Sequence, residues 1–160
     1  MNEVKYYVTK EGLQKIEKDY QQLLAFKKKK TTGEEVPSIW HSEEVNPDYL
    51  AFQEDMSLLE AKLAELELIL KNTELIALPP KEKRKEIFLG ATITLEEIPG
   101  KVINEYTLLG TMEANPAEGK ISDESPVGRT LLGKKLGEEV VISSPIKIVY
   151  RIKKIAYLSL

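Results

Sequence analysis

The most constraining feature of this chain is an unbroken apolar heptad pattern in its first half. Apolar side chains recur in alternating steps of four and three at Phe52, Met56, Leu59, Leu63, Leu66 and Leu70. This spacing places them along one seam of a helix, which is stable when a second helix covers it. Asn46-Pro47-Asp48 predicts the helix start, as a cap, a proline at the first position and an acid in the first turn. The Pro79-Pro80 pair cannot continue a helix, so the pattern ends between Thr73 and Pro80.

An earlier segment supplies the covering helix. From Thr9, a plausible N-cap, to about Phe26, apolar residues recur at helical spacing: Leu13, Ile16, Tyr20 and Leu23. We expect the two helices to form a long antiparallel coiled-coil hairpin with its tip near residues 37–48. Continuing the first register places Lys27 and Lys30 on the seam, and Gly33 and Pro37 disfavour an unbroken helix up to the turn. The distal half of the hairpin is therefore expected to be less tightly packed and more mobile than its base.

The second half of the chain changes to strand-like patterning. Residues 91–95, 102–109, 138–143 and 146–158 are rich in β-branched and aromatic side chains. Turns are expected at Pro99-Gly100 and Ser144-Pro145. Together they predict a small antiparallel sheet. With the hairpin, this gives an α+β chain with domains 1–80 and 81–160, and residues 81–86 are either a charged linker or the edge of the second domain.

A short helix is expected within the second half. Ser125 is its N-cap and Pro126 its first residue, and Gly133 closes it. Leu131 and Leu132 are expected to face inward.

Composition removes several classes of function. The 160 residues include no cysteine, which excludes disulfides, thiolate catalysis and Cys-ligated zinc, and His41 is the single histidine. We find no nucleophile–base pair that would indicate an independent hydrolase. No signal peptide or membrane span is apparent, so we expect a cytoplasmic protein, and a monomer because the hairpin occupies its own seam.

Charge is distributed unevenly in the first half. A basic block, Lys27, Lys28, Lys29 and Lys30, is followed by no further Lys or Arg until Lys62. The interval contains only acidic charges, at Glu34, Glu35, Glu43, Glu44, Asp48, Glu54, Asp55 and Glu60. The predicted hairpin places much of this acidic stretch at its far end.

Residues 125–135 (SPVGRTLLGKK) closely resemble the C-terminal helix segment of the bacterial Gre-type transcription elongation factors. Residues 7–13 (YVTKEGL) and 88–93 (FLGATI) also look like this family at the expected positions. The resemblance covers almost the whole chain. It implies an FKBP-like C-terminal domain that docks on the rim of the RNA polymerase secondary channel, while the hairpin enters the channel.

The resemblance also implies a mechanism. Acids at the hairpin tip would help to hold a second Mg²⁺ at the polymerase's own active site and promote hydrolysis of backtracked RNA. The protein would have no cofactor and no active site of its own. Its partners would be the polymerase and, indirectly, the 3′ end of the nascent RNA.

The tip departs from the family pattern. The usual tip, G-D-L-x-E-N-A-E-Y, aligns with residues 41–49 (HSEEVNPDY), so Ser42 and Val45 stand at the two essential acid positions. Cleavage would have to use the displaced acids Glu43, Glu44 or Asp48, with Glu44 and Asp48 as the candidate ligands of the polymerase Mg²⁺. In the alternative interpretation, these acids bind no metal: Asp48 complements the helix dipole, and the glutamates keep the turn soluble.

The other candidate residues also have two interpretations. Lys27–Lys30 could contact RNA phosphates or form a solvated face, and Trp40 could stack on an RNA base or pack over the end of the hairpin. His41 could serve as a general base, although no partner for it is apparent. Arg129, Lys134 and Lys135 could bind the polymerase or only complement a helix end.

We predict a Gre-like regulator of transcription elongation. One form of this hypothesis is that the protein also stimulates cleavage of backtracked RNA. The alternatives are a Gre-like channel-blocking inhibitor and a coiled-coil adaptor or chaperone.

Overall fold

The computed structural model describes residues 4–33, 36–37, 46–143 and 145–157. The chain forms two compact units. We call Gln14–Asn72 the helix pair, and Met1–Leu13 together with Thr73–Leu160 the body. These units differ in extent from the predicted domains 1–80 and 81–160, because the first 13 residues and those from Thr73 onward belong to one unit.

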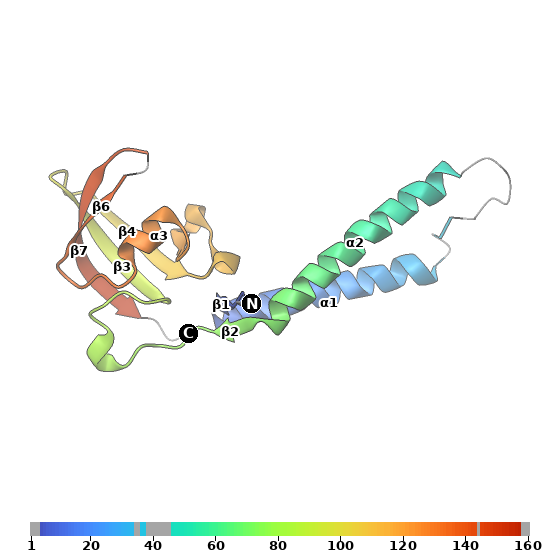
Figure 1. Cartoon of the computed structure of the whole chain (residues 1–160), viewed down its shortest axis with the longest axis horizontal. Helices are drawn as coiled ribbons and strands as arrows, with labels where there is room; N and C mark the ends of the chain where they lie inside the picture. Colours follow the sequence, from blue (N-terminus) through green and yellow to red (C-terminus); the bar gives the residue numbers. More distant parts are fainter. Residues whose placement is uncertain (1–3, 34–35, 38–45, 144, 158–160) are drawn as a thin grey trace. The chain divides into compact units, whose positions relative to one another are not determined.

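Two long helices, α1 (Lys10–Thr32) and α2 (Pro47–Lys71), account for the helix pair. They run in opposite directions (Figure 1). Helix α1 is longer than predicted, since it continues through the lysine block and ends just before Gly33. Helix α2 begins as predicted: the Asn46 side chain accepts a hydrogen bond from the Asp48 N–H at 3.0 Å, and Pro47 is the first helical residue. Neither helix is long and apolar enough to cross a membrane, nor is any other helix in the described residues.

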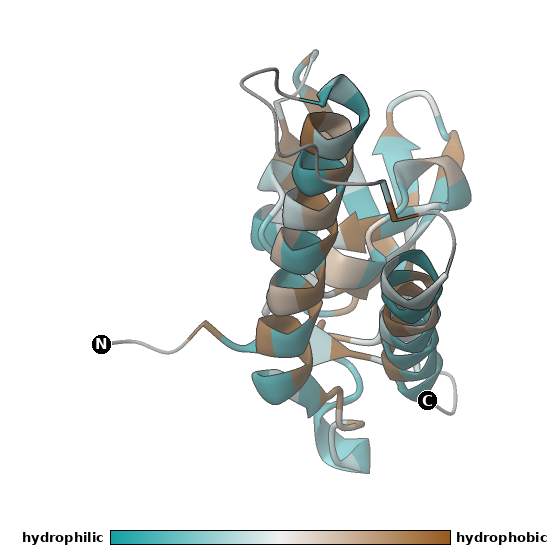
Figure 2. Ribbon diagram, turned by 90° about the vertical axis from the view of Figure 1, so that its right-hand side faces the viewer, coloured by the Kyte–Doolittle hydropathy of each residue, from teal (hydrophilic) through white to brown (hydrophobic). Residues whose placement is uncertain are grey.

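The predicted seam is buried unevenly along the helix pair. Near the base, the predicted residues Ile16, Leu63 and Leu66 are buried. The predicted residue Leu70 is only half-buried, and its neighbour Ile69 is buried instead. Toward the N-terminal end of α2, Phe52, Met56 and Leu59 are only half-buried. Hydrophobic and hydrophilic stretches lie side by side on the turns of both helices (Figure 2). The distal part is thus less tightly packed than the base, as the sequence predicts, because the α1 register supplies lysines there instead of apolar side chains.

Two short strands join the ends of the helix pair to the body. Strand β1 (Tyr6–Val8) pairs in parallel with β2 (Thr73–Leu75), and the Ile76 N–H donates to the Val8 carbonyl at 2.8 Å. Val8 is fully buried, and Lys5 forms an ion pair with Glu74. These two strands are not predicted from the sequence.

A five-stranded sheet forms most of the body. Its strands are β3 (Ala91–Ile98), β4 (Ile103–Leu109), β5 (Lys120–Ser122), β6 (Glu139–Ile142) and β7 (Ile148–Tyr157), in the order β5-β4-β3-β7-β6. Strand β5 runs parallel to β4, so the expectation of a purely antiparallel sheet is wrong at this edge. The reason is that the connection is a crossover and not a hairpin turn. It contains two short 3₁₀ helices, η2 (Thr111–Glu113) and η3 (Pro116–Glu118), and β5 then runs in the same direction as β4.

The core lies between the sheet and helix α3 (Pro126–Leu131). Its most buried side chains are Ile87, Ile93, Leu95, Leu108, Leu131 and Ile152, each at most 1% exposed. At its margin, the Tyr157 hydroxyl donates to the Glu86 carbonyl and accepts from the Phe88 N–H. Burial raises the pKa of Tyr157, which keeps this hydroxyl protonated as a donor.

Residues 81–86 belong to the edge of the body. A 3₁₀ helix, η1, covers Lys81–Lys83, and Glu86 forms a β-bridge with Lys135. The Leu136 N–H donates to the Lys85 carbonyl at 2.9 Å. Of the two alternatives for this charged segment, the edge of the second domain is therefore confirmed.

The seam predicts a contrast between two leucines of α2. Leu63→Ala should lower the free energy of unfolding by about 2–5 kcal/mol, because Leu63 is only 7% exposed and its loss leaves a cavity. Leu58→Ala, which has the same chemistry at a site 71% exposed, is the matched control and should change stability little. Urea unfolding followed by helical circular dichroism measures both. Equal losses would contradict the assignment of this seam.

Candidate functional site

Helix α3 is positioned by a hydroxyl and a glycine. The Ser125 Oγ accepts a hydrogen bond from the Gly128 N–H at 3.0 Å and donates to the Ser122 carbonyl at 2.6 Å. Pro126 is the first helical residue, as predicted. A Cβ at Gly128 would overlap the Ser122 carbonyl oxygen, so only glycine allows the helix to approach strand β5 this closely. The predicted cap and proline are therefore confirmed, and the glycine has a steric reason.

The chain after α3 is tied to the edge of the body. Gly133 has φ +80°, a left-handed conformation that favours glycine, and its N–H donates to the Ile87 carbonyl at 2.8 Å. The Ile87 N–H in turn donates to the Lys134 carbonyl at 2.8 Å, and the Lys135 N–H donates to the Glu138 side chain. These bonds hold residues 133–135 in a defined path beside residues 85–87.

The expectation that Leu131 and Leu132 both face inward is half right. Leu131 is fully buried, whereas Leu132 is 44% exposed. The helix ends at Leu131, and Leu132 has φ −56° and ψ 128°, which are extended values. A residue that leaves the helix no longer follows its inward-facing periodicity, so Leu132 points away from the core.

We define the α3 surface as Arg129, Leu132, Lys134, Lys135 and Leu136. Arg129 and Lys135 are exposed and Lys134 is half-buried. Leu136, like Leu132, is exposed. None of the three cations takes part in an ion pair between described residues. An apolar surface beside unneutralised cations suits a protein partner that offers apolar and acidic side chains.

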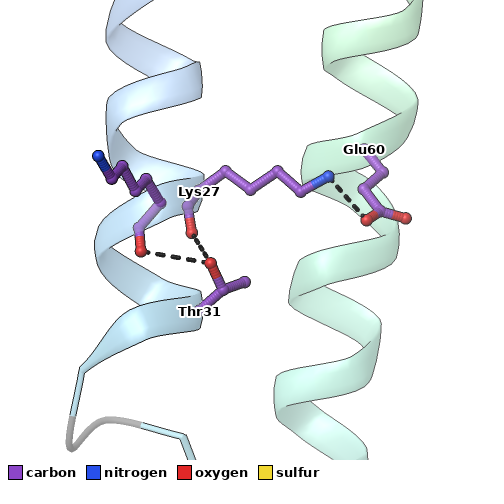
Figure 3. A network of polar contacts seen from close by, with 4 residues as sticks. Lys27, Thr31 and Glu60 are labelled. Carbon is purple, nitrogen blue, oxygen red and sulfur yellow. Dashed lines mark hydrogen bonds and ion pairs between the residues drawn. The ribbon is translucent and has the colours of Figure 1, made fainter.

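The four lysines of the basic block differ in their contacts and exposure, because they lie on different faces of α1. Lys27 reaches across to α2 and forms an ion pair with Glu60 at 2.9 Å (Figure 3). Lys30 lies over the Phe26 ring at 5.5 Å from its centroid. Lys28 and Lys29 are exposed, whereas Lys27 and Lys30 are half-buried. The block therefore does not present four equivalent cations, and Lys28 and Lys29 are the pair best placed to meet a polyanion.

Among the candidate tip residues, the structure describes Asp48. Asp48 is exposed in the first turn of α2, where a carboxylate complements the positive end of the helix dipole. Trp40, His41, Glu43 and Glu44 lie outside the described residues. Within the described ranges, no group of three or more His, Asp or Glu side chains could hold a metal ion.

The role of Glu113 is not apparent from the sequence. Its carboxylate accepts hydrogen bonds from Thr9 at the start of α1, 104 positions earlier in the chain. The local sequence carries no signal for such a contact, because it depends on how η2 and β1 meet in the body.

Comparison with known proteins gives matches along most of the chain. A family model described as "Transcription elongation factor, GreA/GreB, C-term" matches residues 81–157. Transcription elongation factor GreA of Bacillus cytotoxicus is 33% identical over 141 residues, which cover 88% of this chain and 89% of the relative. The same-named protein of Thermomicrobium roseum is 37% identical over 139 residues, covering 86% and 88%. Among solved structures, GreA factor homolog 1 of Thermus thermophilus aligns with a TM-score of 0.43 and 21% identity, covering 96% of this chain and 99% of that one.

The geometry of α3 predicts the effect of removing its cap. Ser125→Ala should lower the stability of the body by about 1 kcal/mol, because the Gly128 N–H loses its acceptor. Ser125→Thr keeps a hydroxyl and should recover most of this loss. Unfolding in urea, followed by near-ultraviolet circular dichroism of the body tyrosines, measures both variants. If Ser125→Ala unfolds at the same urea concentration as the unchanged protein, the hydroxyl does not stabilise α3.

Proposed function

Because this chain belongs to the GreA/GreB family of transcription elongation factors, we propose that it binds RNA polymerase through its body and modulates elongation through its helix pair. The observation that carries this proposal is the extent of the match. The two relatives described above align over 88% and 86% of this chain, which includes residues of both compact units. A protein that acts on bacterial RNA polymerase works in the cytoplasm, and we propose that this one acts as a monomer.

The body is the part that we assign to docking. In the Gre-type proteins that residues 125–135 resemble, the C-terminal domain is FKBP-like and grips the rim of the polymerase secondary channel. The α3 surface supports the same role here, because it presents Arg129, Lys134 and Lys135 beside exposed Leu132 and Leu136. Exposed leucines supply desolvation energy on binding, and the cations provide orientation and a faster encounter with an acidic partner.

The helix pair is the part that we assign to the channel. We propose that it is an antiparallel coiled-coil hairpin that carries residues 37–48 toward the polymerase active site. The burial of Ile16, Leu63 and Leu66 along a three–four seam supports this assignment. The exposed cations Lys28 and Lys29 would then lie along the path of the nascent RNA and contact its phosphates, and Trp40 is the candidate for stacking on a base.

The chemistry belongs to the polymerase. The protein contributes carboxylates, the hard oxygen ligands that Mg²⁺ prefers, to a reaction centre held by its partner. A second Mg²⁺ there supplies stabilisation of the attacking and leaving oxygens in RNA hydrolysis. The candidate carboxylates of this chain are Glu43, Glu44 and Asp48. Asp48 is exposed on the first turn of α2, which is compatible with reaching a metal that the partner holds.

A second candidate function is occupation of the channel without cleavage. The sequence at the tip favours it, because Ser42 and Val45 stand where the family has its two essential acids. Such a protein would slow nucleotide addition instead of restarting stalled complexes. The comparisons offer no support for the adaptor or chaperone alternative.

Transcript cleavage separates the two candidates. If the displaced acids function, adding this protein and Mg²⁺ to a backtracked complex should release short RNA from the 3′ end. Glu44→Gln should then abolish release without weakening polymerase binding. Glu54→Gln, which neutralises an exposed acid farther along α2, is the matched control.

The other outcomes are equally informative. Binding without cleavage, together with slower nucleotide addition, would identify a channel-blocking regulator. Absence of binding to the polymerase would contradict the proposed function.

The division of the lysine block predicts two different salt dependences. Lys28→Gln with Lys29→Gln should reduce the slope of log affinity against log salt for an elongation complex, because two exposed cations no longer displace counterions from RNA. Lys27→Gln with Lys30→Gln should reduce it less, since Lys27 already pairs with Glu60 and Lys30 lies over Phe26. Affinity measured at several salt concentrations provides the slopes. Equal slopes for the two double variants would contradict the division.

A further inference from the structure

A carboxylate from η2 caps the first turn of helix α1. The Glu113 Oε2 accepts a hydrogen bond from the Thr9 N–H at 2.6 Å, and Oε1 accepts from the Thr9 hydroxyl at 2.5 Å. The Thr9 Oγ1 in turn accepts from the Gly12 N–H at 3.0 Å. Thr9 therefore caps the first turn of α1 with its own hydroxyl and also binds the carboxylate that η2 supplies.

A side chain at residue 12 would have to displace the Glu113 carboxylate. A Cβ on Gly12 would overlap the carboxylate of Glu113, although most helix interiors disfavour glycine. A glycine in the first turn lets the carboxylate approach the positive end of the helix dipole. Glycine at residue 12 is therefore what allows the Glu113 carboxylate to occupy its present position.

The backbone beside Glu113 is held just as closely. A Cβ on Gly110 would overlap the Tyr7 carbonyl oxygen, so β1 passes directly against the residue that precedes η2. The Glu113 N–H donates to the Gly110 carbonyl at 3.2 Å, which sets the η2 turn. Glu113 is consequently presented to Thr9 from backbone that β1 already contacts.

Helix α1 links this contact to the helix pair. Residues up to Leu13 belong to the body and residues from Gln14 onward to the helix pair, yet α1 is one continuous helix from Lys10 to Thr32. A constraint on its first turn therefore constrains the direction of the whole helix.

We propose that Glu113 is a positioning residue, which fixes the first turn of α1 to the body and so restricts the range of orientations of the helix pair. This inference rests on the proposed function for its purpose. A body that docks on the polymerase delivers the tip to a defined place only if the helix pair cannot swing freely. A charge-assisted hydrogen bond at a helix terminus suits this task better than a neutral cap, because it is roughly twice as strong.

The range of orientations can be measured on the free protein. The chain has no cysteine, so Ala51→Cys on exposed α2 and Lys147→Cys on the exposed surface of the body give two unique sites for spin labels. Glu113→Ala should broaden the distribution of distances between the labels. Glu105→Gln, which removes an exposed carboxylate from β4, is the control and should leave it unchanged. An unchanged distribution in Glu113→Ala would overturn the proposal.

Gly12 provides an independent way to break the same contact. Gly12→Ala should displace the Glu113 carboxylate and broaden the distribution as Glu113→Ala does. In the double variant, Gly12→Ala should not broaden the distance distribution beyond that of Glu113→Ala alone. The double variant should also have a higher thermal midpoint than Glu113→Ala, because alanine is a better helix former than glycine. Thr9→Ser keeps the hydroxyl and should behave as the unchanged chain. Additive broadening from Gly12→Ala and Glu113→Ala would overturn the assigned contact.

The effect of the Glu113 variant on transcription elongation gives a second, separate measurement. Glu113→Ala should keep the concentration needed for half-maximal effect on an elongation complex and lower the maximal effect, because the body still docks while the tip is delivered less often. A broader distribution with an undiminished maximal effect would overturn the positioning role. If the unchanged protein does not bind polymerase, the proposed function fails, while the spin-label result still decides whether Glu113 holds the helix.

Discussion

The pairing of β1 with β2 is the interaction on which the rest of the architecture depends. Three residues on each side of the helix pair form a short parallel ladder, and the buried Val8 anchors it in the body. The chain leaves the body at the start of α1 and returns to it at Thr73, so the helix pair is an excursion whose two ends are held together. Strand β1 leads into α1 and α2 leads into β2, so the strand pair ties together the two helix ends near which the buried residues Ile16, Leu66 and Ile69 lie.

Burial then decreases along the helix pair for a chemical reason. Apolar partners on α1 are replaced by Lys27 and Lys30, which lie half-buried on the same face. An ion pair with Glu60 takes the place of apolar contact at this level. Because an exposed or partly exposed ion pair stabilises by at most about 1 kcal/mol, the distal part gains less from packing than the base does. A region of low packing density opens locally at a lower free-energy cost than a buried core.

The body combines a buried core with the α3 surface, whose three cations take part in no ion pair between described residues. Strand β3 lies at the centre of the sheet, between β4 and β7. Helix α3 covers one part of the sheet, and the hydrogen bonds around Ile87 and Gly133 fix the turn that follows α3. These contacts leave Leu132 and Leu136 exposed beside Arg129, Lys134 and Lys135, while the backbone of residues 133–135 stays hydrogen-bonded to the body. A preorganised surface loses little conformational entropy on binding, which favours its use in docking.

The sequence by itself determined the elements whose signals are local. The Asn46 cap of α2 and the Ser125-Pro126 start of α3 depend on residues within one helical turn, and both appear in the structure. The resemblance carried by residues 125–135 likewise identified the family before any geometry was known. Tertiary structure alone decided the rest: the β1–β2 pair, the parallel strand β5, the exposure of Leu132 and the grip of Glu113 on Thr9. These features join segments far apart in the chain, or depend on where a helix stops against its neighbours, and no local pattern of residue types encodes such contacts.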